Sequence, residues 1–207
     1  MDLKSTYNRI AEDWHKDHTK DSWWVEATDT FIASLKPDAL ILDVGCGSGV
    51  KAKYLIEHGL EVVGIDLSER MIEIAKREVP DGEFRVMDMC DVSELSHDFD
   101  GIFVQAALLH IPKAKAQSVL SGLVATMKPG GYFYVGVKEK WPGKKDEEIL
   151  HENDYGYEYE RFFSYFTLDE IKQYFLNLKL TISYENVTKS GKTNWIQVIG
   201  RSTDRLL

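Results

Sequence analysis

The chain has little cysteine and lacks long apolar runs. Cys46 and Cys90 are its only cysteines in 207 residues, and both lie in proposed binding loops rather than in a framework of spaced pairs. We therefore expect no disulfides and a reduced, cytoplasmic protein. No apolar stretch approaches the ~20 residues that span a bilayer. The segment 1–14 lacks the apolar core of a signal peptide and is too acidic for a transit peptide.

Positive charge is also scarce. The formal net charge is −9 at pH 7, whereas nucleic-acid-binding proteins usually carry an excess of basic residues that neutralises phosphates. The basic cluster at 138–145 is followed by three acids at 146–148, which favours a solvated loop. No group of His, Cys, Asp or Glu has metal-ligand spacing. We expect no metal and no nucleic-acid partner, while both a monomer and a dimer stay open.

Apolar periodicity predicts strands that alternate with helices. Two helices, at 5–18 and 24–35, are expected before the first strand. The expected strands are 40–44, 61–65, 83–87, 101–104 and 132–137, and the helices between them are 49–58, 68–79 and 112–127. Alternation of this kind is typical of a doubly wound, parallel α/β sheet.

The C-terminal part follows a different pattern. Thr167 and Glu170 form a capping box that begins a helix. Two strands follow, at 180–187 and 194–200, and the link between them is too short for anything but an antiparallel hairpin. Because no repeat or composition shift divides the chain, we expect one domain over residues 1–207.

The segment 40–49, LILDVGCGSG, is the most informative stretch. A buried strand runs into three glycines, which let a ligand lie directly on the backbone. A dinucleotide site needs G-x-G-x-x-G, but here the third glycine comes one residue early, at Gly49, and Asp43 would repel a pyrophosphate. A P-loop lysine is absent too. These features disfavour a nicotinamide oxidoreductase and favour S-adenosylmethionine (SAM), a cationic adenosine compound without phosphate.

Five segments in order resemble the class I SAM-dependent methyltransferases, the family of the type 11/25 methyltransferase domain. They are LDVGCGSG at 42–49, GIDLSERMIEIAK at 64–76, VMDMCD at 86–91, FDGIFVQAALLHIP at 99–112 and LVATMKPGGYFYVGV at 123–137. The resemblance implies a Rossmann-like, seven-stranded α/β sheet. That sheet is mostly parallel, with an antiparallel strand in the C-terminal hairpin and helices on both faces.

The resemblance also implies which residues hold SAM and its product S-adenosylhomocysteine. Asp43, with the loop of Gly45, Cys46 and Gly47, is expected at the methionine part. Cys46 itself reads as a small residue packed under the loop, not as a nucleophile. Asp66 follows Gly45 by 21 residues, close to the ~20 at which an acid reaches the ribose hydroxyls.

The adenine end is expected between Leu67 and Met89, with Asp88 accepting from the exocyclic amine. Asp91 is close enough to take that role instead. Gln105, at the end of the fourth strand, is expected at the methionine carboxylate or ammonium.

The residues expected at the transferred methyl group come from two further segments. The segment 7–14 is similar to the Tyr-Asp-x-x-Ala-x-x-Tyr lid of small-molecule methyltransferases, so 1–36 is interpreted as a helical lid and Tyr7 or Trp14 as facing the sulfonium. Both rings also fit a plain apolar helix face. His110 is the candidate general base, with an expected pKa near ~6.5; the alternative is a histidine that only bonds local backbone.

The segment 141–166 is interpreted as an insertion at the acceptor site. Its tyrosines alternate with acids, which favours a cationic or amphipathic small acceptor; the alternative is a solvated loop that buries Phe162, Phe163 and Phe166. We therefore expect methyl transfer to a small or medium-sized acceptor through an oxygen, nitrogen or carbon atom. A tRNA or protein methyltransferase and a non-catalytic SAM-binding regulatory module remain alternatives.

Overall fold

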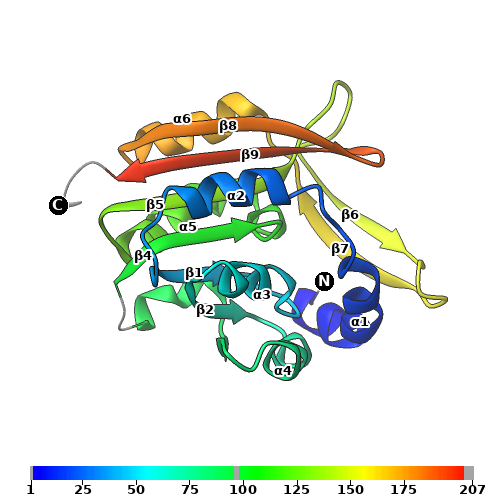
Figure 1. The fold of residues 1–207 in the computed structure, drawn as a ribbon. Coiled ribbons are helices and arrows are strands. Elements are labelled where there is room, and N and C mark those ends of the chain that lie inside the picture. Colours follow the sequence, from blue (N-terminus) through cyan, green and yellow to red (C-terminus); the bar gives the residue numbers. More distant parts are fainter. Residues whose placement is uncertain (1, 96–97, 203–207) are drawn as a thin grey trace.

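A mixed sheet organises the described part of the chain, which in the computed structural model comprises residues 2–95 and 98–202 (Figure 1). The strand order is β3-β2-β1-β4-β5-β9-β8. Its strands are β1 (Leu40–Val44), β2 (Glu61–Asp66), β3 (Glu83–Val86), β4 (Phe99–Gln105), β5 (Met127–Lys138), β8 (Leu180–Ser190) and β9 (Thr193–Ser202). The first five run parallel, and β9 is antiparallel to both of its neighbours.

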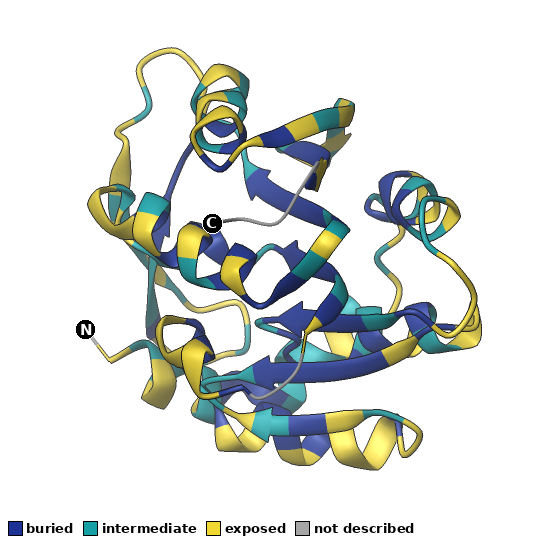
Figure 2. Cartoon of the chain, turned by 90° about the vertical axis from the view of Figure 1, so that its left-hand side faces the viewer, coloured by how far each residue is buried: buried dark blue, intermediate teal, exposed yellow. Residues whose placement is uncertain are grey.

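Helices cover both faces of this sheet. They are α1 (Leu3–His18), α2 (Val25–Ala33), α3 (Val50–Glu57), α4 (Glu69–Glu78), α5 (Lys113–Ala125) and α6 (Leu168–Asn177), with 3-10 turns η1 (Met89–Glu94) and η2 (Leu108–His110). In Figure 2 the strands are mostly buried and the outer sides of the helices are exposed. No helix among residues 2–95 and 98–202 is long and apolar enough to cross a membrane.

Alternate residues of each strand supply two separate apolar cores. Leu42 and Val44 of β1 pack with α5 and α6 on one face, whereas Ile41 packs with α2, α3 and α4 on the other. A central strand covered on both faces is apolar at nearly every position, which is why segment 40–44 reads as a continuous run. The α/β fold class expected from the sequence is confirmed, including an antiparallel strand in the C-terminal hairpin, which is β9.

The starts of β4 and β5 differ from the expected boundaries, and the other expected strands differ by no more than three residues at an end. β4 begins at Phe99 and β5 at Met127, because these two residues pair ahead of a register shift. The expected turn at 128–131 is therefore an irregularity inside β5, where Gly130 takes a φ of 77°. The capping box of Thr167 and Glu170 and the hairpin of β8 and β9 are confirmed.

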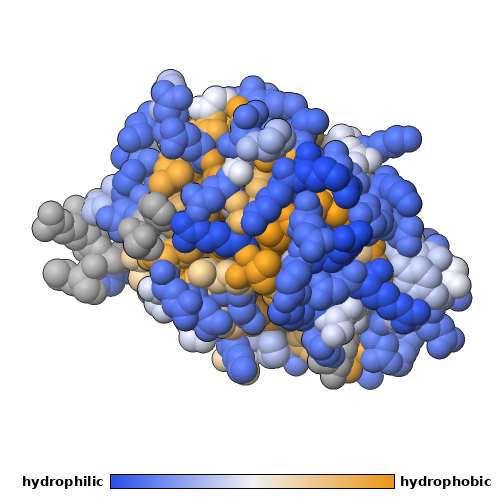
Figure 3. All heavy atoms as spheres, turned by 90° about the horizontal axis from the view of Figure 1, so that it is seen from below, coloured by the Kyte–Doolittle hydropathy of each residue, from blue (hydrophilic) through white to orange (hydrophobic). Residues whose placement is uncertain are grey.

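The insertion at 141–166 forms a second, two-stranded sheet. Antiparallel strands β6 (Glu147–Glu152) and β7 (Tyr159–Ser164) extend from the main sheet beside α1 (Figure 1). Phe163 and Phe166 are buried and Phe162 is partly buried. Seen from below, the molecule shows apolar side chains gathered among hydrophilic ones near the middle of that face (Figure 3).

Candidate active site

A cavity of about 650 Å³ lies at the carboxyl ends of β1, β2 and β4, beside α1. Open α/β sheets bind ligands at this edge, where the strand order reverses. The cavity brings together every site residue named from the sequence. These are Tyr7, Trp14, Asp43, Gly45, Cys46, Gly47, Asp66, Leu67, Asp88, Met89, Gln105 and His110.

The glycine loop after β1 is shaped by positive backbone angles. Gly45, Gly47 and Gly49 have φ values of 67°, 53° and 82°, which side chains disfavour. The amides of Gly45 and Cys46 both donate to the Ile65 carbonyl, at 2.8 and 3.0 Å, and so tie the loop to β2. A Cβ atom at Gly45 would overlap that of Ala107. The loop thus presents bare backbone to the cavity.

Two carboxylates face this loop. Burial raises the pKa of Asp43 to about 7 and that of Asp66 to about 6. Asp66 accepts from the amides of Gly47 and Ser68, at 3.0 and 2.9 Å, and these bonds oppose part of the increase. Asp43 is 2% exposed, and its Oδ2 atom has no hydrogen-bond partner. An unpartnered buried carboxylate oxygen indicates that a cationic or donor ligand completes the site.

Cys46 is a packing residue. Its thiol is buried beneath the loop and packs against Gly64, where a Cβ atom would lie only 2.9 Å from the sulfur. Burial, followed by the charges of Asp43 and Asp66, raises the pKa of this thiol well above its ordinary value. A thiol that stays protonated is a poor nucleophile.

The far end of the cavity is apolar with an acidic rim. Leu67 and the buried Met89 line it, together with Asp88 and Asp91. Asp88 also accepts from the Cys90 amide at 2.9 Å and so caps η1. Both acids therefore remain candidates for a purine amine.

Gln105 ends a buried polar chain. Its Oε1 accepts from the Tyr134 hydroxyl, which in turn accepts from Gln197 Nε2 at 3.2 Å. Gly136, opposite Gln105 on β5, leaves room for the amide because a Cβ there would overlap it. Gln105 Nε2 is buried at the cavity without a partner. It is a second group that a ligand can satisfy.

Tyr7 and His110 lie in direct contact. The Tyr7 hydroxyl is 2.7 Å from His110 Nε2, and His110 Nδ1 is 2.8 Å from the Phe162 carbonyl. Because that carbonyl only accepts, Nδ1 carries the proton and Nε2 accepts from Tyr7. Burial, together with the charges of Arg161 and Lys138, lowers the pKa of His110 to about 3. The value near ~6.5 expected from the sequence is therefore wrong, and the ring is neutral at physiological pH.

Trp14 lies over the glycine loop. Its ring stacks on His18 at a centroid distance of 4.1 Å and would sit 3.5 Å from a Cβ at Gly47. Lys51 Nζ is 5.8 Å from the centre of the Trp14 ring and also lines the cavity.

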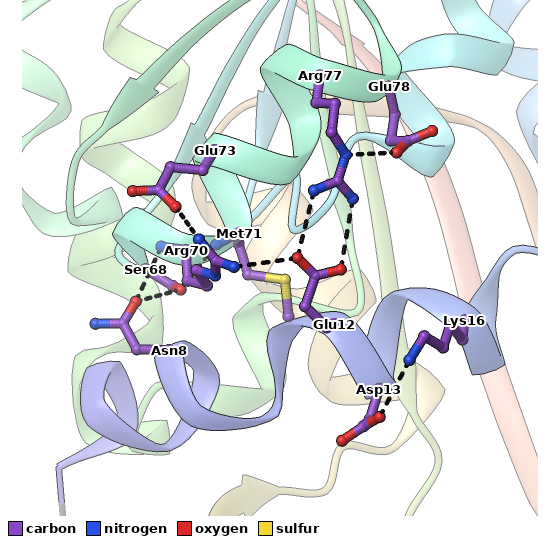
Figure 4. Close-up of polar contacts among 10 residues, drawn as sticks. All are labelled: Asn8, Glu12, Asp13, Lys16, Ser68, Arg70, Met71, Glu73, Arg77 and Glu78. Carbon is purple, nitrogen blue, oxygen red and sulfur yellow. Dashed lines mark hydrogen bonds and ion pairs between the residues drawn. The ribbon is translucent and has the colours of Figure 1, made fainter.

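Helix α1 is held on the side of α4 by polar contacts (Figure 4). Asn8 accepts from Ser68 Oγ at 2.7 Å and from the Arg70 amide at 3.1 Å. Glu12 pairs with Arg70 and Arg77, each at 3.3 Å. Asn8, which replaces the usual Asp of the lid segment, thus fixes α1 to the start of α4.

The β6–β7 hairpin holds the other side of α1. The Tyr157 hydroxyl donates to Asp13 at 2.9 Å, and Arg9 donates to the Glu158 carbonyl at 2.9 Å. Through Tyr7, α1 also reaches His110. The helix is therefore bonded to both walls of the cavity.

Four acids of the hairpin segment line a separate outer groove beside the start of α1. These acids are Glu152, Asp154, Glu158 and Glu160. The side of the hairpin toward His110 carries Phe163 and Arg161. Glu152 also bonds to Arg161, at 2.6 and 2.7 Å, so one acid of the hairpin lies on this inner side and is paired there. The acidic character expected for the acceptor site therefore stays a prediction.

The basic cluster at 138–145 is largely neutralised. Lys140 pairs with Asp146 at 3.0 Å, and Lys144 pairs with Glu148. Lys138 is partly buried over the Phe163 ring. These contacts differ from the solvated loop expected for this segment. Among residues 2–95 and 98–202, no group of three or more His, Cys, Asp or Glu could hold a metal ion.

Comparison with known proteins identifies a domain within the chain. Residues 41–131 match a family model described as a methyltransferase domain. The chain is also similar in sequence to named methyltransferases. It is 38% identical over 131 residues to phosphoethanolamine N-methyltransferase 1 of Zea mays, covering 60% of this chain and 26% of that protein. It is 35% identical over 98 residues to the ubiquinone biosynthesis O-methyltransferase of Coxiella burnetii, covering 45% and 41%. The chain thus spans less than half the length of these relatives.

Solved structures show the same fold for the methyltransferase domain. A Burkholderia thailandensis 1,6-didemethyltoxoflavin-N1-methyltransferase, crystallised with 1,6-didemethyltoxoflavin and S-adenosylhomocysteine, superposes with a TM-score of 0.76. Its sequence is 21% identical, and the match covers 98% of this chain and 88% of that one. The magnesium protoporphyrin IX methyltransferase of Synechocystis, with bound SAM, gives a TM-score of 0.73 at 17% identity, over 97% and 95% of the two chains.

Three charged residues of the methyltransferase domain were not singled out as site residues from the sequence. Lys51 follows the glycine loop, a position that reads as an ordinary helix start. Lys138 and Arg161 are 23 residues apart, and no local pattern shows that Phe163 brings them together. Arg161 pairs with Glu152 at 2.6 Å.

Proposed function

We propose that the protein is a SAM-dependent methyltransferase that acts on a small or medium-sized acceptor, by in-line displacement onto an oxygen, nitrogen or carbon atom. The observation that carries the proposal is the pair of buried carboxylates, Asp43 and Asp66, over a glycine loop inside a matched methyltransferase domain. The named relatives and the SAM-bound structural neighbours support it.

The residues of the cavity fit this cofactor. Asp43 Oδ2 would receive the ammonium of the methionine part, which removes the cost of an unpaired buried carboxylate. Asp66 is oriented by two backbone amides and would accept from the ribose hydroxyls. Gln105 Nε2 and Lys51 are donors for the methionine carboxylate. Leu67 and Met89 would enclose the adenine.

When bound, SAM supplies a methyl group on a positively charged sulfur. The protein's task is then alignment and exclusion of water, and positioning alone supplies about 7–11 kcal/mol in favourable cases. We assign this task to α1 as a lid, with the rings of Tyr7 and Trp14 at the cavity. The contacts of α1 with α4 and with the hairpin support the assignment.

His110 is the proposed base for acceptors that arrive protonated. Its Nε2 accepts a hydrogen bond and faces the cavity, with Tyr7 as its present donor. The bond from Nδ1 to the Phe162 carbonyl would stabilise the ring as it takes the acceptor proton.

Both cysteines are free thiols, which supports a cytoplasmic location; cell fractionation tests it. No observation favours the two alternative functions. The paired lysines at 140 and 144 offer little to RNA phosphates.

The proposal is tested by calorimetry and by transfer of label. We expect SAM and S-adenosylhomocysteine to bind the purified protein and NAD not to bind. Incubation with methyl-labelled SAM and a small-molecule extract of the native cells is then expected to label one fraction. Binding of a dinucleotide, with no uptake of SAM or its product, would overturn the proposal.

A further inference from the structure

A cation without a counter-ion lies next to the cavity, behind the Phe163 ring that contacts His110. Lys138 Nζ sits 3.8 Å from the centre of the Phe163 ring and 5.9 Å from that of Trp195. Within the described residues it forms no ion pair, unlike Lys140 and Lys144 of the same cluster. Lys138 is only partly buried, so a ligand can reach it.

The Phe163 ring connects this cation to the proposed transfer site. The same ring lies 5.0 Å from the His110 ring and 5.1 Å from the Arg161 guanidinium carbon. Gln105 is opposite Gly136 on β5, so Lys138 lies one side-chain row further toward the carboxyl end of the sheet than the Gln105 amide. Side chains at i and i+2 point to the same face, which places Lys138 on the Gln105 side of β5.

The charges around Lys138 leave a net positive site. Glu152 forms two bonds with Arg161, at 2.6 and 2.7 Å, and holds the guanidinium in place. Lys144 is balanced by Glu148. Lys138 is therefore the charge that remains uncompensated. Burial and the charge of Arg161 lower its pKa to about 8, which leaves it mostly protonated at neutral pH.

Aromatic rings complete the surroundings. Trp195 is paired with Lys138 across β5 and β9, and Trp23 stacks on Trp195 at a centroid distance of 4.0 Å. The rings hold the lysine in place, and a cation that no carboxylate neutralises favours a ligand with negative charge, because charge-assisted hydrogen bonds are the strong ones.

We propose that Lys138 is a specificity-determining residue that binds an anionic group of the methyl acceptor, so that the acceptor is an organic anion. This inference rests on the proposed function and adds to it the substrate class. The anion would be a carboxylate or a phosphate a few bonds from the methylated atom, with the nucleophile near His110 and the charge near Lys138.

The first test uses the charge of the labelled product. Wild-type protein is incubated with methyl-labelled SAM and the small-molecule extract, and the products are separated on an anion exchanger at neutral pH. Label in the retained fraction supports the inference. Label only in neutral or cationic material overturns it and leaves the methyltransferase proposal standing. Phosphatase treatment of the extract then distinguishes phosphate acceptors from carboxylate acceptors.

The second test removes the charge. We expect Lys138→Met to raise KM for the retained acceptor about tenfold or more, the loss of one charge-assisted bond, with a much smaller change in kcat. Lys138→Arg is expected to recover most of the affinity. Lys140→Met, two residues along on the surface, is the matched control and should behave as wild type.

Three readouts keep the conclusions separate. Calorimetry should give all variants the same SAM affinity, and thermal melting should show that Lys138→Met folds. If wild-type protein binds no SAM, or labels nothing in the extract, the proposed function fails. If SAM binds and label transfers but Lys138→Met keeps the wild-type KM, the inference alone is overturned.

Discussion

The two halves of the cavity are built in different ways. The cofactor half comes from short loops that directly follow β1 and β2, and its residues lie within contiguous motifs. The proposed acceptor half is lined by residues of α1 and η2, with the end of β5 and the β6–β7 hairpin packed behind them, and these elements are distant in sequence. The difference teaches that a contiguous backbone motif can be read from sequence, whereas a wall made by long-range packing cannot. The predictions below test this division.

Loss of the candidate base should have the largest effect on the rate. It should change only functions of the acceptor half and leave SAM affinity as it is. We expect His110→Ala to lower kcat about 10²–10⁴-fold, because proton transfer by a positioned side chain contributes that much. SAM affinity by calorimetry should stay unchanged. Tyr7→Phe, which removes only the hydroxyl that bonds Nε2, is the milder companion. Normal turnover of His110→Ala on an identified acceptor would show that the base is not His110.

Loss of the Asp43 charge should act on the cofactor half. We expect Asp43→Asn to weaken SAM binding about 100-fold, since a buried charge-assisted bond is lost. The free protein should nevertheless become more stable at pH 8 by about 1 kcal/mol, or about 2–4 °C in Tm, because an unpaired buried carboxylate is removed.

Calorimetry and thermal melting at pH 8 measure the two effects of Asp43→Asn. Asp81→Asn, an exposed acid outside the cavity, is the control. A variant that loses stability and keeps its SAM affinity would contradict the assignment.

The pH dependence of SAM affinity tests whether the two carboxylates of the cofactor half contact the ligand. The free-state pKa values of Asp43 and Asp66 are about 7 and about 6, and a cationic ligand favours their ionised forms. Affinity should therefore be full above pH 8 and fall as the pH drops through these values, by about tenfold or more between pH 8 and 6. Calorimetry across this range checks it, and a flat profile would argue against contact between the carboxylates and the ligand.

The sign for stability is the opposite. A carboxyl whose folded-state pKa lies above its unfolded value stabilises the fold at low pH, and this contribution is lost as the pH rises through the folded value. Ligand affinity and free-protein stability should thus move in opposite directions between pH 6 and 8.

Loss of the contacts that hold α1 should have the smallest effect on SAM affinity. Because α1 lies beside both halves of the cavity, both should be affected. Asn8→Ala removes bonds to Ser68 and the Arg70 amide, and we expect a loss in SAM affinity of about two- to tenfold. Added salt should weaken the exposed Glu12 pairs and lower affinity slightly further. Thr19→Ala, beyond the contacts with α4, is the control for a helix change without loss of docking. An unchanged affinity in Asn8→Ala would show that α1 does not cover the cofactor.

Sequence reasoning reached the fold and the cofactor half because both depend on local rules. Periodicity located the strands, and the spacing from Gly45 to Asp66 placed two acids at one edge of the sheet. It failed where burial decides the chemistry. The pKa of His110 and the inward position of Arg161 depend on a hairpin that only the folded chain brings against η2. The alternation of Tyr155, Tyr157 and Tyr159 does not mark a strand either, because the first two lie in the turn between β6 and β7 and only Tyr159 begins β7.

Helix α1 has a kinetic consequence, because one rigid element is bonded to α4, to the hairpin and to His110. Cofactor and acceptor then cannot exchange independently: displacement of the helix to release one also disturbs the surroundings of the other. We expect an ordered reaction cycle in which departure of the spent nucleoside is the slow event, and in which trapping the helix in place would halt turnover after a single round.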